Sequence, residues 1–600
     1  MGPTARSAFY FLAGIAVLGL VPAALAHGDE HGDMDMDMDM GAPSEPKPDS
    51  EYPPTYFAHP EHTGAIMTHI ALMVLGWVFV LPVAVMLSIA RSRYTLMLQF
   101  VFLAVNGAGV LFGVVYNTNT PDLYPNNAHH KLGWLVTWVI SAQVVVGLVG
   151  RVAGAFSGKD SGRSKVSAER QGFIPVSTEA MAEHLRLNES RVSGHFRRSN
   201  DSGQGTEPNT ESLRSHSVST NEDEIESPLH EARKEYADDD DYLDVDLEAD
   251  VPAVSRGGAV QAFAKKVGGL ISSRAWKFLV FGYNFVDRTS LILGFIALCT
   301  GIITYGRFFE GRAIFNGLAH WIKGGVFVWL GLFTLGRWAG SFGELGWAWN
   351  IRPKTAGQKW RPSAEFVESF LIFFYGSTNI FLEHLGGWGG EWTPTDMEHI
   401  SITVLFIGGG MCGMLIESIR IRDLLNTTVT ESANTYPGHA HNDQDRQNLE
   451  EPETYRFSMN PIPALVILLT GMMMSSHTQA SMISSMVHKQ WGNLLAGASF
   501  ARGFTYVLTY LKPPRSIMPS RPPTELLASF GLISGGIIFM ASSSDTVGGM
   551  EHYDLDAMFI YTVTMGIVGL LMAWEIIVIA IKGWAVRREA GWPARGLSRV

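Results

Sequence analysis

The chain has 600 residues, of which 46% are hydrophobic and 17% are charged, with a formal net charge of −12. Its two cysteines form neither a CxxC pair nor a disulfide framework, which excludes a disulfide-stapled fold. No P-loop or dinucleotide-binding glycine pattern follows a strand-like segment, so the chain offers no recognisable nucleotide site. We also expect no nucleic-acid partner.

The N-terminus has the pattern of a secretory signal peptide over residues 1–26. Arg6 precedes an apolar run from Ala8 to Leu20, and Ala24-Leu25-Ala26 supplies small residues for cleavage. The mature chain would then begin at His27, in the lumen or outside the cell. A retained signal anchor fits less well, because the run is short and Pro22 interrupts it.

The tail that follows, residues 27–60, is rich in side chains that bind copper. A free N-terminal amine beside its own imidazole chelates Cu(II), and thioethers in a flexible tail suit Cu(I). The residues that we expect to bind copper are His27, His31, Met34, Met36, Met38 and Met40. The alternative is a solubilising low-complexity tail.

Apolar runs of about 18–25 residues recur along the rest of the chain, the length that crosses roughly 30 Å of hydrocarbon. We predict an all-α integral membrane protein with about eleven transmembrane helices after a cleaved signal peptide. The expected spans are 69–90, 95–116, 131–153, 278–305, 314–336, 363–385, 399–419, 460–479, 489–511, 524–543 and 556–582.

Basic residues fall at alternate span ends, which predicts a lumenal or outer N-terminus and a cytosolic C-terminus. With the signal peptide, this pattern indicates a secretory-pathway membrane: the plasma membrane, the vacuole or the Golgi. The lipid bilayer is thus one partner, and the sequence leaves the oligomeric state open.

Polar stretches between the spans divide the chain into regions. Residues 61–153 carry three spans, and the cytosolic loop 154–270 is rich in Ser, Asp and Glu and is expected to be disordered. That loop would be a spacer or a phosphorylated regulatory segment. Residues 271–586 carry eight further spans, and 587–600 form a cytosolic tail. A shorter polar linker is expected at 423–457.

Histidines gather at the lumenal ends of the spans. His69 lies 22 residues before Arg91, and His129 stands at the same distance before Arg151. Both imidazoles should therefore lie at similar depth, and two facing neutral imidazoles are what a six-coordinate b-type haem requires. We predict haem ligation by His69 and His129, with His130 as the alternative to His129. The competing interpretation is a set of interfacial histidines bonded to loop carbonyls.

A second group of ligand-type side chains lies near the lumenal ends of the C-terminal spans. Its members are His320, Glu383, His384, Asp396, His399, His477 and His488. Imidazole and carboxylate suit divalent metals, and a second haem between two of these histidines is the alternative. The segment His488-Lys489-Gln490-Trp491-Gly492 repeats the His-x-x-x-Gly spacing that starts at His129.

Charged residues within the spans are few. Arg502 and Glu575 could pair with each other or form part of a proton route. Glu365 and Glu368 stand one helical turn apart near the cytosolic face, where we expect them to bond to loops.

The first and third spans resemble two core helices of the ascorbate-reducible transmembrane b-type cytochromes. The stretch from His69 through Gly76-Trp77, Pro82 and Ala90-Arg91 resembles the first, and His129-His130-Lys131-Leu132-Gly133 with Gln143 is similar to the third. This resemblance implies a lumenal haem and favours His129 over His130. Those cytochromes carry a further histidine at the start of the second core helix, where Tyr94–Gln99 has none. A cytosolic haem is therefore not expected.

Four further motifs resemble those of a fungal family of transmembrane proteins, the Ytp-like proteins. They are Phe315-Asn316-Gly317-Leu318-Ala319-His320-Trp321, Gly346-Trp347-Ala348-Trp349-Asn350, Leu382-Glu383-His384-Leu385-Gly386 and Glu398-His399-Ile400-Ser401-Ile402. The resemblance runs across nearly every span from 278 to 582. It implies the architecture but no activity.

Three functions remain open. The working hypothesis is a haem-containing membrane oxidoreductase or electron-transfer protein that acts on a metal or small molecule at the lumenal or outer face. Its cofactor would be haem b, with copper as a second candidate, and its electron donor is unidentified. The alternatives are a copper- or zinc-binding transporter or accessory protein without redox turnover, and a haem-free scaffold.

Overall fold

The computed structural model describes residues 52–157, 274–311, 313–353, 362–379, 392, 394–435, 451–476 and 479–590. Within these residues the secondary structure is helical and contains no strand. The signal peptide, the expected copper ligands of the tail and residues 158–270 of the predicted loop lie outside the described residues. The first four residues of that loop, 154–157, are helical rather than disordered, because the preceding helix runs on to Ser157.

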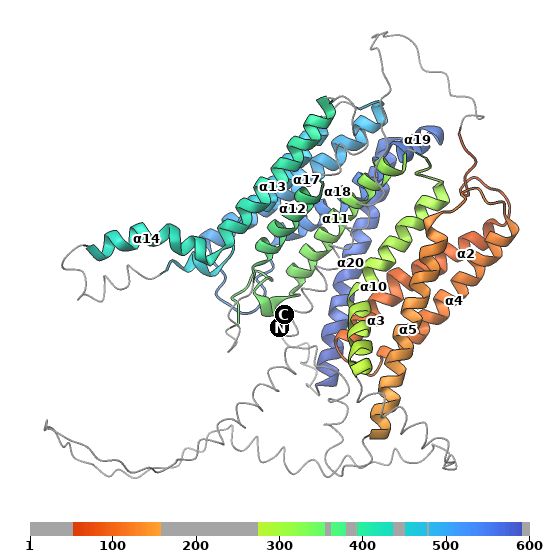
Figure 1. The fold of residues 1–600 in the computed structure, drawn as a ribbon, viewed down its shortest axis with the longest axis horizontal. Helices are drawn as coiled ribbons and strands as arrows, with labels where there is room; N and C mark the ends of the chain where they lie inside the picture. Colours follow the sequence, from red (N-terminus) through yellow and green to blue (C-terminus); the bar gives the residue numbers. More distant parts are fainter. Residues whose placement is uncertain are drawn as a thin grey trace, which may run out of the picture. The chain divides into compact units, whose positions relative to one another are not determined.

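A helix lies at each predicted span (Figure 1). The helices are α2 (Thr63–Val74), which continues through a π-helical turn η1 (Leu75–Val80) into α3 (Leu81–Ile89), α4 (Thr95–Asn119), α5 (Ala128–Ser157), α10 (Arg274–Gly306), α11 (Ala313–Ala339), α12 (Ala364–Asn379), α13 (Pro394–Glu417), α16 (Ile462–Ser476), α17 (Met482–Leu511), α18 (Pro523–Ala541) and α20 (Ala557–Glu589).

Among the described residues, 8 helices are long and apolar enough to cross a membrane. The helices α12 and α16 have only 16 and 15 residues. The helix α17 is long enough, but it carries polar residues such as His488, Lys489 and Arg502. The protein is therefore a helical membrane protein.

Two span starts differ from the prediction in a way that matters for the histidines. The first helix begins at Thr63 rather than at 69, and α17 begins at Met482 rather than at 489. The side chain of Ser481 caps α17 by accepting a hydrogen bond from the Ser484 amide at 3.1 Å. His69 and His488 thus lie inside their helices, where the helical backbone fixes the direction of each side chain.

The expected polar linker at 423–457 is helical in its first part, where α14 (Ile419–Thr435) covers residues 423–435. Leu424, Leu425 and Val429 of this helix are exposed. Three short elements complete the described set. They are the α-helix α19 (Ser544–His552) and two single 3-10 turns, η3 (Gly343–Leu345) and η5 (Glu453–Arg456).

Helices α2, α4, α5 and α10 form what we call the first bundle (Figure 1). The helix α2 packs on α4, α4 packs on α5, α5 packs on α10, and α10 returns to η1 and α3. The carriers of His69 and His129, α2 and α5, are therefore diagonal partners. The fourth member, α10, comes from the region that the sequence assigned to the longer C-terminal part.

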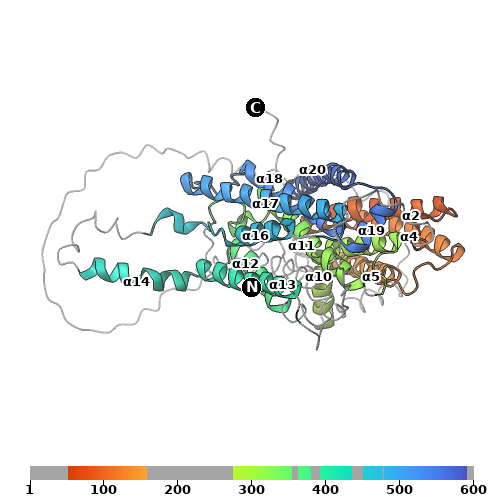
Figure 2. The same ribbon diagram turned by 90° about the horizontal axis from the view of Figure 1, so that it is seen from above.

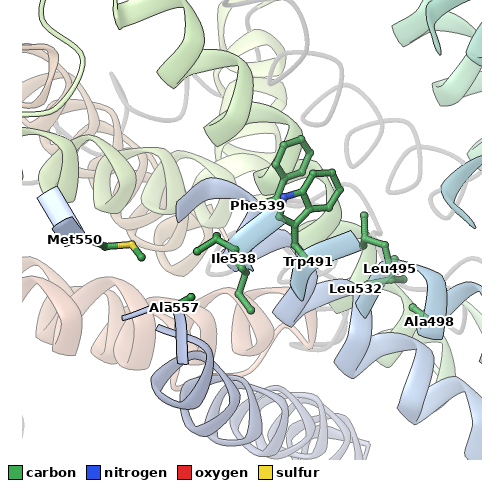
Figure 3. Packing of buried hydrophobic residues seen from close by; sticks show 9 residues of the cluster. Trp491, Leu495, Ala498, Leu532, Ile538, Phe539, Met550 and Ala557 are labelled. Atoms are coloured by element: carbon green, nitrogen blue, oxygen red, sulfur yellow. The ribbon is translucent and has the colours of Figure 1, made fainter. Parts of the chain in front are cut away.

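Helices α11, α17, α18 and α20 form the second bundle, in which α11 and α17 both pack against α18 (Figure 2). The contact of α11 with α18 is close: a Cβ on Gly324 would lie 2.5 Å from the Gly536 carbonyl oxygen. The core of this bundle contains Trp491, Leu495 and Phe539, all nearly inaccessible to solvent (Figure 3). The helices α12, α13 and α16 flank it.

Loops from both bundles join at one end of the helices, and we call this joined region the cap (residues 52–62, 120–127, 307–311 and 542–556). The Tyr124 hydroxyl donates to the Phe308 and Phe309 carbonyls at 2.8 and 3.0 Å. Burial raises the pKa of Tyr124, which keeps this donor protonated. The Phe309 amide in turn donates to the Asp545 carboxylate at 2.6 Å. The cap thus ties together the helix ends nearest the histidines.

The opposite end of the bundles holds the end of α20. The Arg93 amide and the Ser92 hydroxyl both donate to Glu589 at 3.1 Å. The start of the first helix and the end of the last one therefore lie at opposite ends of the described structure.

Candidate functional site

His69 and His129 face each other between α2 and α5. Their ring centroids are 6.2 Å apart and the ring planes make an angle of 80°. The alternative ligand, His130, is exposed, and its Nε2 accepts a hydrogen bond from Trp134 at 3.3 Å. Of the two neighbouring histidines, His129 is therefore the one that meets His69.

Hydrogen bonds at Nδ1 fix the state of both rings. His69 Nδ1 lies 2.8 Å from the Gly109 carbonyl oxygen, which only accepts, so this nitrogen carries the proton. His129 Nδ1 lies 3.2 Å from the Thr300 hydroxyl, which already donates to the Ala297 carbonyl at 3.0 Å. Thr300 therefore accepts from His129. With Nδ1 as the donor, the neutral form of each imidazole has its lone pair on Nε2, the arrangement usual for metal-binding histidines.

Glycines line this pair. A Cβ on Gly113 would lie 2.8 Å from His69 Nδ1, and one on Gly301 would lie 3.2 Å from His129 Cε1. Gly133 stands one turn after His129 on the side that carries the buried Val136 and Ile140, and nothing lies within 4 Å of the position of its Cβ. The pair thus has small-residue walls and open space beside it.

The ring spacing fits two imidazoles on one metal, and the donor set fits a haem better than a bare ion. Metal–imidazole bonds are about 2 Å long, so two rings that share one ion from opposite sides have centroids roughly 6 Å apart. Among the described residues, no group of three or more His, Cys, Asp or Glu could hold a metal. A protein zinc site needs three or four such ligands, whereas haem iron needs only axial ones.

The second predicted group of ligands is brought together in part. His320 of α11 and His488 of α17 have ring centroids 5.9 Å apart at 87°. His399 lies on α13, which packs mainly against α12 and α16. The remaining members, Glu383, His384, His477 and the side chain of Asp396, lie outside the described residues. The observed site is therefore a pair of histidines.

The second pair sits in an aromatic environment. His488 is 4% exposed, and its Nδ1 lies 2.9 Å from the Ser484 carbonyl oxygen one turn earlier. Trp491 and Phe539 stack with centroids 4.1 Å apart (Figure 3), and the Trp491 ring centroid lies 6.0 Å from that of His488. The Phe539 ring also meets His320 edge-on at 5.5 Å.

The other end of the first bundle contains a cavity without a histidine in its lining. Gln99, Gln143 and Asp287 contribute its polar groups. The Gln143 amide donates to Asp287 at 3.3 Å. These residues offer no imidazole nitrogen to a second haem at this end.

Sequence reasoning missed a buried ion cluster at the end of the second bundle away from the cap. Arg337 contacts Glu365 at 2.8 Å and Glu368 at 3.2 Å. Arg502 contacts Glu525 at 2.8 Å and Glu368 at 3.6 Å. All five side chains are buried. The signal that could have revealed it is the placement of Arg337 and Arg502 within apolar helices, since such charges need partners.

This cluster corrects two expectations. Arg502 pairs with Glu525 and Glu368, not with Glu575, because α17 packs against α18 at this level. Glu365 and Glu368 bond to Arg337 rather than to loops, because α12 presents both carboxylates to the last turn of α11.

Comparison with known proteins decides the family. Residues 293–583 match the family described as "Protein YTP1-like, C-terminal", and residues 50–153 match a "Domain of unknown function (DUF2427)". An uncharacterized membrane protein of Schizosaccharomyces pombe is 32% identical over 540 residues, which cover 87% of this chain and 94% of that protein. The chain belongs to the YTP1-like family of fungal membrane proteins.

Two relatives from Saccharomyces cerevisiae match shorter parts of this YTP1-like chain. An uncharacterized membrane protein is 42% identical over 323 residues, 51% of this chain and 47% of its own length. Protein YTP1 is 22% identical over 284 residues, 47% of this chain and 50% of its own length. No solved structure matches. The first histidine pair lies in the segment that matches DUF2427, and the second lies in the YTP1-like segment.

Proposed function

We propose that this YTP1-like protein is a haem-containing membrane oxidoreductase or electron-transfer protein that acts on a metal or small molecule at the lumenal or outer face. The observation that carries the proposal is the His69–His129 pair, with ring centroids 6.2 Å apart on diagonal helices. Four-helix bundles build cofactor sites in this way, from side chains of facing helices.

Each residue around the pair has a separate role in this proposal. His69 and His129 would be the axial ligands, and the bound haem would supply a one-electron carrier. The Gly109 carbonyl and the Thr300 hydroxyl hold the two Nδ1 atoms and direct the Nε2 lone pairs. Gly113, Gly133 and Gly301 keep bulky side chains away from the rings.

The membrane side follows from the topology. We propose about eleven spans with a lumenal N-terminus, which puts the cap and the histidine pair at the lumenal or outer face. The proposed haem therefore lies within reach of that face. The Gln99–Gln143–Asp287 cavity at the other end of the first bundle has no histidine in its lining. We accordingly propose electron exchange at the cap face rather than through a haem pair across the first bundle.

A reduced-minus-oxidised visible spectrum of the detergent-purified full chain tests this function. Wild type should give a b-type difference band, and His69→Ala and His129→Ala should each lower it by the contribution of one haem. His130→Ala is the matched control, because that neighbouring ring faces away from the pair, and it should leave the band unchanged. A folded wild type, expressed with added haem precursor, that shows no band overturns the proposal.

A further inference from the structure

A second histidine pair in the second bundle repeats the construction of the first. The His320 and His488 rings are 5.9 Å apart at 87°, against 6.2 Å and 80° for His69 and His129. We propose that His320 and His488 are the axial ligands of a second haem b. This site goes beyond the proposed function, which needs only the first pair.

The helices that carry the second pair are placed like those that carry the first. Helices α11 and α17 each pack on α18 and also contact α20, so they face each other within the second bundle. His488 Nδ1 donates to the Ser484 carbonyl at 2.9 Å, which leaves the lone pair on Nε2. His488 is only 4% exposed. One imidazole from each of two facing helices, of which His488 is buried and His320 half-buried, is again the donor set of a six-coordinate haem.

The glycine spacing supports the repeat. Three of the four histidines are followed by glycine at the fourth position: Gly133 after His129, Gly324 after His320 and Gly492 after His488. In the second bundle a Cβ on Gly324 would lie 2.5 Å from the Gly536 oxygen, and one on Gly492 would lie 2.5 Å from the Gly471 oxygen. These glycines let each carrier helix press against its neighbour one turn below the histidine.

The surroundings favour a macrocyclic ligand over a hydrated ion. The residues packed around the pair include Trp491 and Phe539, which stack at 4.1 Å, and Val487, which is fully buried. Apolar and aromatic walls stabilise an apolar ring system but not an ion with bound water. No third His, Cys, Asp or Glu joins the pair among the described residues. Within the described part of the chain, a divalent ion would therefore have only these two imidazoles as ligands.

Both pairs lie at the cap end, with α10 beside the first pair and close to the second. Thr300 of α10 contacts His129, and the adjacent Cys299 packs into the cluster that contains Trp321, the residue after His320. Two haems in these positions would both lie beneath the cap.

The test is the number of haems per chain, measured as the pyridine haemochrome of the purified full-length protein. Four single variants are compared: His320→Gln and His488→Gln for the second pair, and His69→Gln and His129→Gln for the first. Glutamine keeps much of the side-chain volume but does not ligate haem iron well. His399→Ala is the control, because this histidine lies on α13 away from both pairs. In each variant, the spectrum of the remaining haem reports whether the fold is intact.

We expect two haems per chain in wild type and in His399→Ala, and one in each of the four glutamine variants. A single haem in wild type that is lost in His69→Gln but kept in His488→Gln overturns this inference and leaves the proposed function standing. A single haem lost only in His320→Gln and His488→Gln keeps the site on the second pair and overturns the first pair as the haem site of the proposed function. Wild type without haem, or with only copper or zinc on His320 and His488, overturns both.

Discussion

The two histidine pairs have nearly the same ring geometry but opposite surroundings. The rings of the first pair donate hydrogen bonds to acceptors on neighbouring helices, and glycines line the pair, with open space at Gly133. The second is held by a carbonyl of its own helix and by tightly packed aromatic rings. The first site should therefore respond to changes in hydrogen bonding and free volume, and the second to changes in packing.

The largest effect is expected from Trp491→Ala. This side chain is fully buried and stacks on Phe539, so its removal should lower the free energy of unfolding by about 3–5 kcal/mol. Thermal unfolding of the detergent-solubilised protein measures this loss. Trp138→Ala is the control, because Trp138 is 67% exposed, and it should change the stability little. Equal stability of the two variants would contradict the view that aromatic packing holds the second pair.

The next effect concerns the stability that buried polar contacts contribute in the two bundles. Arg502→Met leaves Glu525 buried without its cation and should cost about 3–5 kcal/mol. Nearer the middle of the first bundle lies a neutral buried contact, in which the Trp77 indole donates to the Asn106 side chain at 3.0 Å. Asn106→Leu should therefore cost less, about 1–3 kcal/mol. Chemical denaturation of both variants in one detergent compares the two contacts, and a larger loss for Asn106→Leu would reverse the ranking.

Gly133→Leu tests whether the open space beside the first pair is needed for haem binding. The new side chain fills open space, so the apo-protein should keep its stability within about 0.5 kcal/mol, while the first pair loses most of its haem. Gly569→Leu is matched to it, because that glycine also has nothing within 4 Å but lies on α20 away from the histidines. Haem content and apo-protein melting temperature are measured together. Full haem content in Gly133→Leu would show that this space is not part of the site.

The smallest effect is expected from Thr300→Val, which removes the acceptor for His129 Nδ1. Loss of such a partner typically weakens metal affinity about 10–100-fold, and we expect a loss of that order for haem transfer to an acceptor protein such as apomyoglobin. Thr289→Val on the same helix is the control, since that hydroxyl bonds its own helix at the Phe285 carbonyl, 2.9 Å away. The same haem affinity in both variants would contradict the role given to Thr300.

The sequence predicted those features that depend only on position along the chain. Helix positions follow from apolar length, and the first pair could be predicted because equal spacing from Arg91 and Arg151 encodes equal depth in parallel spans. Depth does not say which helices are neighbours. His320 and His488 were therefore predicted only within a larger group, and their partnership depends on the packing of α11 and α17 on α18.

The ion cluster was missed for the same reason. Arg337 and Arg502 stand 165 positions apart in the numbering, and only the packing of α11, α12, α17 and α18 brings their carboxylates to them. The pairing of Arg502 with Glu525 rather than Glu575 shows that depth alone does not choose between two glutamates. Helix contacts make that choice.

The most direct test of the account is the low-temperature electron paramagnetic resonance spectrum of the oxidised, purified wild type. Iron between two imidazoles is six-coordinate, so the account predicts a low-spin ferric haem signal that disappears in the variant with all four histidines, His69, His129, His320 and His488, changed to glutamine. A haem signal that is entirely high-spin, or no haem signal from a folded and haem-supplied protein, would contradict the claim that these histidines form axial ligand pairs.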